Sequence, residues 1–348
     1  MKAPTLNNMK KIRISSHTIM LMITVALFIA LYGAGCVMYA SKSFGKLQNF
    51  LNVLINNAGL LIAACGITCV MLAGGIDISV GSVVAMTCMF MAVGLSEWGM
   101  PSGVLIVLIL FIGVVFGFVQ GYCVAYLEIQ PFIVTMAGLF FARGMTSVIS
   151  TEQVSVPMDS WFGQLSQLKF NIPFGIGAYQ NNKGVWLIPY VRLTVLVALL
   201  MVVITFLMLR YTRFGRSLYA VGGNQQSATL MGLNVKRTKM LSHVLCSFYA
   251  TLGGLCYCLN TMCGTPTQAQ GMEMDAISSA VIGGTLLTGG VGNVIGTLFG
   301  VMINGTISSL VKFNGKLVAS WANIITAILL CFFILLQAVF AKLKERNK

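Results

Sequence analysis

Long runs of apolar residues, separated by polar connections, occupy almost the whole chain. A helix needs about 20 mostly apolar residues to cross the hydrocarbon core of a bilayer. Ten runs approach that length, and the eighth, which contains AVIGGTLLTGG, is the shortest and the richest in glycine. The pattern predicts membrane-spanning helices at residues 18–38, 50–72, 79–97, 103–126, 131–150, 190–211, 240–261, 274–290, 292–312 and 320–341.

Composition agrees with a chain embedded in lipid. Hydrophobic residues make up 57% of the 348 positions and charged residues only 9%, whereas a soluble domain carries about 25% charged residues. We therefore expect an all-α integral membrane protein with about ten transmembrane helices, forming a single polytopic domain over residues 1–348. The first apolar run follows basic residues, as in a signal peptide, but its roughly 20 residues exceed the h-region of such a peptide, so we expect it to be retained.

The distribution of basic residues predicts the orientation in the membrane. With ten spans, the N-terminal segment 1–17, the segment 212–239 and the tail 342–348 all lie on one side. That side holds fourteen lysines and arginines against seven on the other. Since cytoplasmic loops are enriched in basic residues, both termini are predicted to be cytoplasmic. The net charge of +14 therefore reflects membrane topology and not a nucleic-acid partner.

Two connections between spans are unusually long. Residues 151–189 form a predicted external loop with aromatic residues, glycine and proline, which suits a docking surface. Residues 212–239 form a predicted cytoplasmic segment that is too polar to enter lipid. Since a purely structural connection could be far shorter, both segments are candidates for contact with other proteins.

One acidic residue interrupts the apolar pattern after the second span. Asp77 follows Gly74 and Gly75, and the next apolar run begins near Ser79 and Gly81. An aspartate or serine at this place can cap the next helix by accepting its first free amides. Alternatively, the stretch is a polar hinge in a broken helix that lines a pathway, because ionisable groups at membrane depth are costly and usually functional. A capped, broken helix would satisfy both interpretations.

A related stretch lies late in the chain. Glu273 and Asp275 precede another apolar segment of small residues. Ten spans divide into two five-helix halves of opposite orientation, which would place the two acidic stretches near opposite faces of the membrane. Interrupted segments at matching places in two inverted halves indicate a transport site.

Other polar side chains in or beside the spans could line a pathway. Asn56, Asn57, Thr135 and Thr285 can form hydrogen bonds to a substrate or to a neighbouring helix. Arg143 lies within the fifth predicted span, where an unpaired arginine costs at least about 2.5–3.5 kcal/mol. It could line a hydrated path, pair with an acid, or extend to the external interface.

The sequence contains no recognisable catalytic or metal-binding motif. His17 and His243 are isolated and are interpreted as residues at the membrane interface. The ten cysteines are interpreted as small packing residues. No phosphate-binding loop GxxxxGK[ST] is present, so if ATP drives this protein, another subunit must bind it. Glycines spaced every four residues, at 113–121 and 292–300, predict close helix packing.

Four long motifs resemble one family of membrane proteins. They are GGIDISVGSV (74–83), QPFIVTMAG (130–138), RFGRSLYAVGGNQQSATLMGLNV (213–235) and MDAISSAVIGGTLLTGGVGNVIGTLFG (274–300). In this order they resemble the permease subunits of bacterial ABC sugar importers of the ribose, galactose and xylose type. Within that family the chain is most similar to the galactofuranose permeases.

The resemblance implies a division of labour in the bacterial inner membrane. Two permease subunits, identical or paralogous, form the path, two cytoplasmic ATPase subunits hydrolyse ATP–Mg, and an external binding protein delivers the sugar. The chain would then be no enzyme and would hold no cofactor. The residues that match the family's coupling segment, which fits a cleft of the ATPase, are Asn224, Ser227, Ala228, Gly232, Leu233 and Asn234. Ribose, a furanose-like signalling compound and ion-coupled secondary transport are the alternatives.

Overall fold

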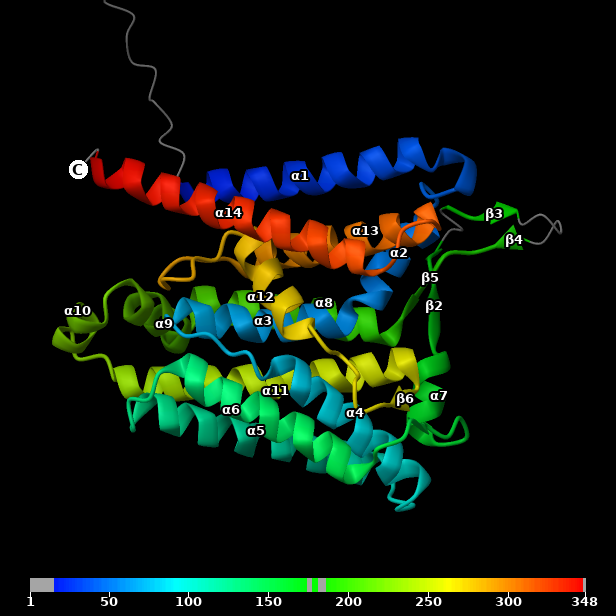
Figure 1. Ribbon diagram of the computed structural model, residues 1–348, viewed down its shortest axis with the longest axis horizontal. Helices are drawn as coiled ribbons and strands as arrows, with labels where there is room; N and C mark the ends of the chain where they lie inside the picture. Colours follow the sequence, from blue (N-terminus) through cyan, green and yellow to red (C-terminus); the bar gives the residue numbers. More distant parts are fainter. Residues whose placement is uncertain (1–15, 174–176, 181–185, 347–348) are drawn as a thin grey trace, which may run out of the picture.

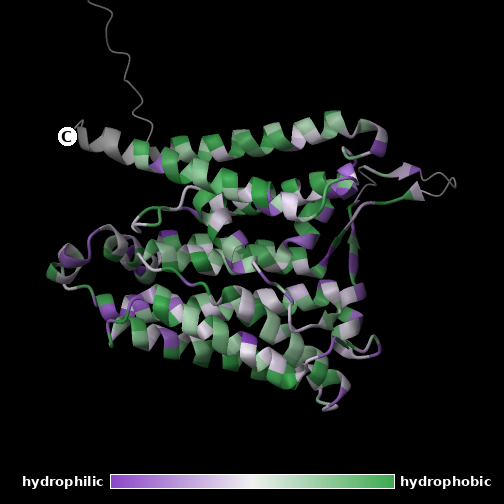
Figure 2. Cartoon of the chain, viewed as in Figure 1, coloured by the Kyte–Doolittle hydropathy of each residue, from purple (hydrophilic) through white to green (hydrophobic). Residues whose placement is uncertain are grey.

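The computed structural model of the chain describes residues 16–173, 177–180 and 186–346. Most of the long helices lie side by side along a common axis and form a bundle (Figure 1). Apolar residues cover the helices, and polar residues collect mainly in the connections at the two ends (Figure 2). This distribution is that of a bundle whose long axis crosses a bilayer.

The helices follow the predicted runs. They are α1 (Ser16–Met38), α2 (Leu47–Asn56), α3 (Ala58–Leu72), α4 (Val80–Ser96), α5 (Ser102–Ala125), α6 (Pro131–Ile149), α7 (Trp161–Gln167), α8 (Leu193–Tyr211), α9 (Arg213–Gly223), α10 (Gln225–Leu230), α11 (Val235–Thr261), α12 (Met272–Ile282), α13 (Val294–Asn314) and α14 (Ser320–Arg346). A 3₁₀ turn, η1 (Ala40–Lys42), follows α1. The chain is therefore an all-α membrane protein in its bulk, as the hydropathy predicts.

Not every predicted span is a full-length helix. Seven of the described helices are long and apolar enough to cross a membrane, and an eighth span is formed by α2 and α3 together, bent by 54°. Helix α4 has 17 residues and α12 only 11. At about 1.5 Å per residue, α12 reaches little more than half of the roughly 30 Å hydrocarbon core.

Two predicted spans need correction. The expected helix over 274–290 is wrong, since α12 ends at Ile282. Gly284, Gly289 and Gly290 take φ values of +91°, +87° and +74°, which a helix cannot contain. The span expected over 50–72 is present but is not one straight helix, because it bends at Asn57 between α2 and α3.

The two long connections form the opposite ends of the bundle (Figure 1). We call them the α10 end, which carries α9 and α10, and the sheet end. Among the residues that the structure describes, the sheet end contains three two-stranded antiparallel pairs, β1 with β6, β2 with β5 and β3 with β4. The strands are β1 (Val154–Ser155), β2 (Lys169–Asn171), β3 (Tyr179–Gln180), β4 (Trp186–Leu187), β5 (Tyr190–Arg192) and β6 (Cys263–Gly264). The N-terminal segment 1–17 lies outside the described residues up to position 15.

Helix α11 lies at the centre of the bundle and packs against α3, α4 and α5. The α5 glycines make this close approach possible. A Cβ added at Gly117 would lie 2.8 Å from the carbonyl oxygen of His243, and one at Gly121 would lie 2.5 Å from that of Met240. The later stripe packs in the same way, since a Cβ at Gly300 would overlap the carbonyl of Ser279. The α5 stripe is thus confirmed as a helix-packing face, as are Gly296 and Gly300 of the later stripe, whereas Gly292 lies before α13 begins.

Candidate transport and coupling sites

The first break in the membrane region is the segment Ala73–Ser79, which joins α3 to α4. Helix α3 ends where Gly74 takes a φ of +80°, and the chain then runs back into the bundle without helical structure (Figure 1). Asp77 Oδ1 accepts hydrogen bonds from the Ser79 amide at 2.9 Å and from the Ser79 hydroxyl at 2.6 Å. Asp77 therefore stabilises the turn directly before α4, close to the predicted cap, while its role as a hinge stays a prediction.

Asp77 also has a partner that the sequence did not suggest. His243 of α11 lies with Nδ1 3.6 Å from Asp77 Oδ2, and the two side chains are 2% and 0% exposed. The interpretation of His243 as a residue of the membrane interface is wrong, because the ring is buried inside the bundle. The pair joins the first break to the helix that begins directly after α10.

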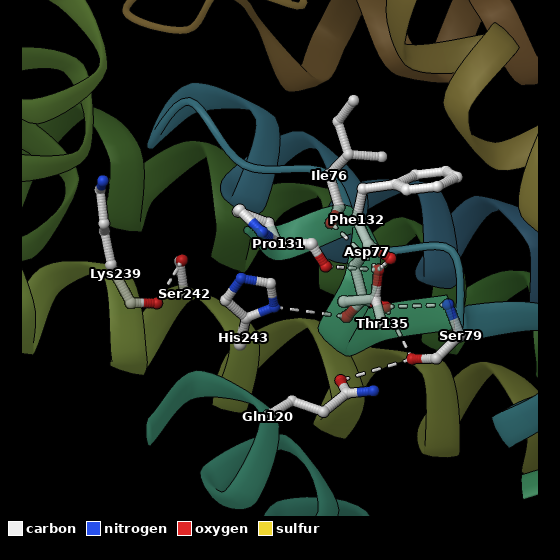
Figure 3. A network of polar contacts seen from close by, with 10 residues as sticks. All are labelled: Ile76, Asp77, Ser79, Gln120, Pro131, Phe132, Thr135, Lys239, Ser242 and His243. Atoms are coloured by element: carbon white, nitrogen blue, oxygen red, sulfur yellow. Dashed lines mark hydrogen bonds and ion pairs between the residues drawn. The ribbon is translucent and has the colours of Figure 1, made fainter. Parts of the chain in front are cut away.

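Two more polar side chains surround the first break (Figure 3). Gln120 of α5 places its amide oxygen 3.4 Å from the Ser79 hydroxyl oxygen. Its amide nitrogen is buried without a hydrogen-bond partner among the described residues. Thr135 of α6 donates to the Pro131 carbonyl at 2.9 Å and lies 3.4 Å from the Ile76 carbonyl. Three helices, α5, α6 and α11, and the first break thus contribute to one buried polar cluster.

The second break is the segment Met262–Gly271, which leads from α11 to α12 and contains β6. Arg143 of α6 donates two hydrogen bonds to it, to the carbonyls of Pro266 at 3.1 Å and Gln268 at 2.7 Å. Glu273 lies in the first turn of α12, directly after this segment. Arg143 thus compensates carbonyls that an unwound segment leaves without helical partners.

The two breaks meet inside the bundle. A Cβ added at Gly81, in the first turn of α4, would overlap the Glu273 carboxylate and lie 2.9 Å from the Ala269 carbonyl and 3.1 Å from the Glu273 amide. The N-termini of α4 and α12 are therefore neighbours, although the two segments enter from opposite ends (Figure 1). Glu273 Oε2 is buried there without a hydrogen-bond partner among the described residues.

Three glycine-rich turns meet at the α10 end. A Cβ added at Gly222 of α9 would overlap the Leu72 carbonyl at the end of α3 and the Gly290 amide. Gly290 donates its amide hydrogen to Leu72 at 3.0 Å, and a Cβ at Gly289 would lie 2.8 Å from Gly74. We call these turns, residues 73–75, 222–223 and 288–290, the glycine junction. It brings the coupling segment against the first break and against the turn that follows α12.

The predicted coupling residues form one compact unit. Asn224 caps α10 by accepting from the Ser227 amide at 2.8 Å, and Asn234 caps α11 by accepting from the Arg237 amide at 2.9 Å. Ala228 is buried and packs in a small apolar cluster together with the partly buried Leu233. The cluster holds α10 against α9 and α11.

The tip of this unit contains the predicted Gly232 and two residues, Leu230 and Met231, that sequence reasoning missed. Gly232 turns the chain after α10 with a φ of +79°. Leu230 and Met231, just before it, are 89% and 69% exposed. Two apolar side chains exposed on a polar segment indicate a protein contact. Their place at the end of a short helix, next to a glycine turn, was the available signal.

The remaining predicted residues do not join either break. Asn57 donates to the Val53 carbonyl at 2.7 Å and so satisfies its own helix, and Asn56 is exposed. Thr285 is buried after α12, and its hydroxyl has no partner among the described residues. Asp275 accepts through its backbone carbonyl from Asn304 at 3.2 Å. The structure thus divides the predicted pathway residues among four places.

Comparison with known proteins defines the class. Residues 49–334 match the family model described as branched-chain amino acid transport system, permease component. The chain belongs to this family of ABC-transporter permeases. It is 39% identical over 329 residues to the inner membrane ABC transporter permease protein YjfF of Escherichia coli, covering 94% of each chain.

Two further relatives carry the names of sugars. The fructose import permease protein FruG of Bifidobacterium longum is 33% identical, over 94% of this chain and 93% of its own. The ribose import permease protein RbsC of Escherichia coli is 35% identical, over 77% of this chain and 79% of its own. No solved structure matches the chain. The predicted resemblance to sugar-importer permeases is confirmed.

Proposed function

We propose that the chain is the membrane-spanning permease subunit of an ATP-driven importer that moves a monosaccharide into a bacterial cell. Relatives named for ribose and fructose import support a sugar as the cargo. Both sugars can close into five-membered rings, so we assign a furanose as the substrate class. Galactofuranose is the first sugar to test, and ribose or a furanose-like signalling compound would use the same machine.

The meeting of α4 and α12 at Gly81 and Glu273 carries this proposal. The first amides of a helix have no intrahelical acceptor and can donate to a hydroxyl group. The buried Glu273 oxygen can accept from another hydroxyl. Interrupted helices with their N-termini near the middle of the membrane are the usual form of a transporter site. A sugar, uncharged and rich in hydroxyls, suits such a set of donors and acceptors.

The glycine junction supports coupling to an external source of energy. A displacement of α9 would act directly on Leu72 and Gly290, because backbone meets backbone at Gly222. Leu72 precedes the first break, and Gly290 follows α12. Force on α10 could therefore change both broken segments together, which alternating access requires.

We propose three partners for the chain. A cytoplasmic ATPase subunit binds ATP–Mg and holds α10, so the chain itself hydrolyses nothing. An external binding protein delivers the sugar to the sheet end, and a second permease subunit, identical or paralogous, completes the path. The excess of basic residues on one side supports an α10 end and termini that face the cytoplasm of the cell.

One observation favours a second candidate, an ion-coupled secondary transporter. Asp77 and His243 form a buried pair, and such acid–histidine pairs carry protons in some membrane pumps. This candidate gives no account of the exposed tip at Leu230 and Met231.

Reconstitution separates the two candidates. The chain is placed in proteoliposomes with its ATPase and binding protein, and uptake of labelled galactofuranose, ribose and fructose is measured. We expect uptake that requires ATP, stops with vanadate and is insensitive to a protonophore. Replacing Glu273 by Gln should lower uptake at least tenfold, while Glu97→Gln, at the far end of α4, serves as the matched control. Uptake without the ATPase, driven by a proton gradient, would replace our proposal by the second candidate.

A further inference from the structure

A basic pocket lies between α8, α9 and the turn before α13, at the α10 end. It has a volume of about 480 Å³ and is lined by Phe206, Leu209, Arg210, Arg216 and Tyr219, with residues 290–293 as its floor. Tyr219 fixes the floor, since its hydroxyl donates to the Gly292 carbonyl at 3.0 Å. The transport path proposed above does not use this pocket.

Two guanidinium groups enter the pocket without an acidic partner. Over the part of the chain that the structure describes, no carboxylate lies within ion-pair distance of Arg210 or Arg216. Arg216 donates to the Tyr211 carbonyl at 3.2 Å, and Arg210 lies 5.6 Å from the centre of the Tyr211 ring. Both groups are thus positioned while most of their N–H donors stay available. Planar guanidinium donors match the oxygens of a phosphate in pairs.

The position of the pocket favours a lipid over a free anion. Val203, Ile204 and Leu207 of α8 are 43–51% exposed along the apolar face that leads to the pocket. Arg210 stands at the end of that face, where the headgroups of a bilayer begin. Phe206 and Leu209 add an apolar wall, which an acyl chain or glycerol backbone can contact and an inorganic anion cannot use.

We infer that this pocket binds the phosphodiester headgroup of an anionic phospholipid of the leaflet at the α10 end. Arg210 and Arg216 bind the phosphate oxygens, and the apolar wall holds the first carbons of the acyl chains. Basic pockets between transmembrane helices at the cytoplasmic side are a recurrent form of lipid site. The bound lipid would brace α8 against α9 and the glycine junction. The inference does not depend on the identity of the transported sugar.

Native mass spectrometry of the full-length protein tests the inference. Phosphatidylglycerol and phosphatidylcholine with matched acyl chains are added to the detergent-purified chain, and retained lipids are counted. We expect phosphatidylglycerol to bind at least tenfold more tightly, and the double variant Arg210→Gln, Arg216→Gln to lose that preference. Arg213→Gln is the matched control, because Arg213 is exposed on α9 but does not line the pocket.

Further experiments distinguish a lipid phosphate from a free phosphate and control for misfolding of the variants. Circular dichroism and gel filtration check each variant, and Arg216→Lys, which keeps the charge but loses the planar fork, should show an intermediate loss. Inorganic phosphate and glycerol 3-phosphate should not displace the lipid, and displacement by either would make this a free-anion site. An equal loss of the preference for phosphatidylglycerol in Arg213→Gln would overturn the assignment of the lipid site to this pocket. Absence of the lipid from the complex with the ATPase would show that protein covers the pocket and would overturn the inference.

Discussion

Asp77 and His243 form a buried acid–histidine pair, with 3.6 Å between carboxylate and ring nitrogen, that ties the first broken segment to α11. Asp77 has a second task, since its other oxygen accepts both polar hydrogens of Ser79. One carboxylate therefore fixes the turn before α4 and joins it to the helix that follows the coupling segment. The two tasks can be separated by substitution.

Asp77→Asn keeps an oxygen for the Ser79 amide but loses the charge beside His243, whereas Asp77→Ala loses both. We expect melting temperatures in detergent to fall in the order wild type, Asp77→Asn, Asp77→Ala. Loss of the turn contact alone should cost about 1 kcal/mol, and a buried histidine without a partner adds to it. His243→Gln should resemble Asp77→Asn. Equal melting of Asp77→Ala and wild type would show that the pair contributes nothing.

Gly81→Ala should separate the two broken segments. Its Cβ would meet the backbone at Ala269 and Glu273, which cannot move as freely as a side chain end. We expect a loss of about 1–3 kcal/mol of stability, as for overpacked cores, together with lower uptake in proteoliposomes. Gly144→Ala is the control, because no atom lies within 4 Å of a Cβ at that glycine of α6. A variant with native stability and uptake would remove the proposed meeting point.

Gly222→Ala tests the glycine junction, with Gly223→Ala, at the adjacent residue, as the control. A Cβ at Gly222 would overlap backbone atoms of Leu72 and Gly290, while one at Gly223 would meet nothing within 4 Å. We expect Gly222→Ala to reduce uptake per ATP hydrolysed at least severalfold and Gly223→Ala to leave it unchanged. Transport and hydrolysis are measured in the same proteoliposomes. Identical behaviour of the two variants would mean that backbone contact here does not transmit force.

The sequence was sufficient to predict where the helical segments lie, but not where each helix ends or what it contacts. Apolar run length located the long helices, because lipid demands nearly continuous apolar character. It overran at α12, since Leu286 and Leu287 are apolar yet lie among glycines whose positive φ values end the helix. Hydropathy indicates whether a segment lies in lipid or in water, whereas its backbone conformation decides where a helix ends.

The site shows the same division. The motif GGIDIS predicted a break after the second span, and the structure has one there. The histidine opposite Asp77 could not be predicted, because an isolated His243 in an apolar run has the same local pattern at an interface and in a core. The glycine junction joins three turns far apart in the chain, and local composition contains no record of such contacts. Arg143 was expected to line a hydrated path, to pair with an acid or to extend to the external interface, whereas its hydrogen bonds go to the Pro266 and Gln268 carbonyls.

The tip of the coupling segment allows the most direct test of energy transfer. Gly232 has a φ of +79° and open space around it, so Gly232→Val strains the turn by about 1–2 kcal/mol without blocking insertion. We expect this variant to lose uptake while the complex still hydrolyses ATP, and Gly232→Asn, which tolerates the left-handed conformation, to retain most of it. Leu230→Ala should weaken binding of the ATPase, measured by pull-down from detergent, since its exposed apolar side chain is removed. Undiminished uptake in Gly232→Val would place the coupling contact elsewhere in the chain.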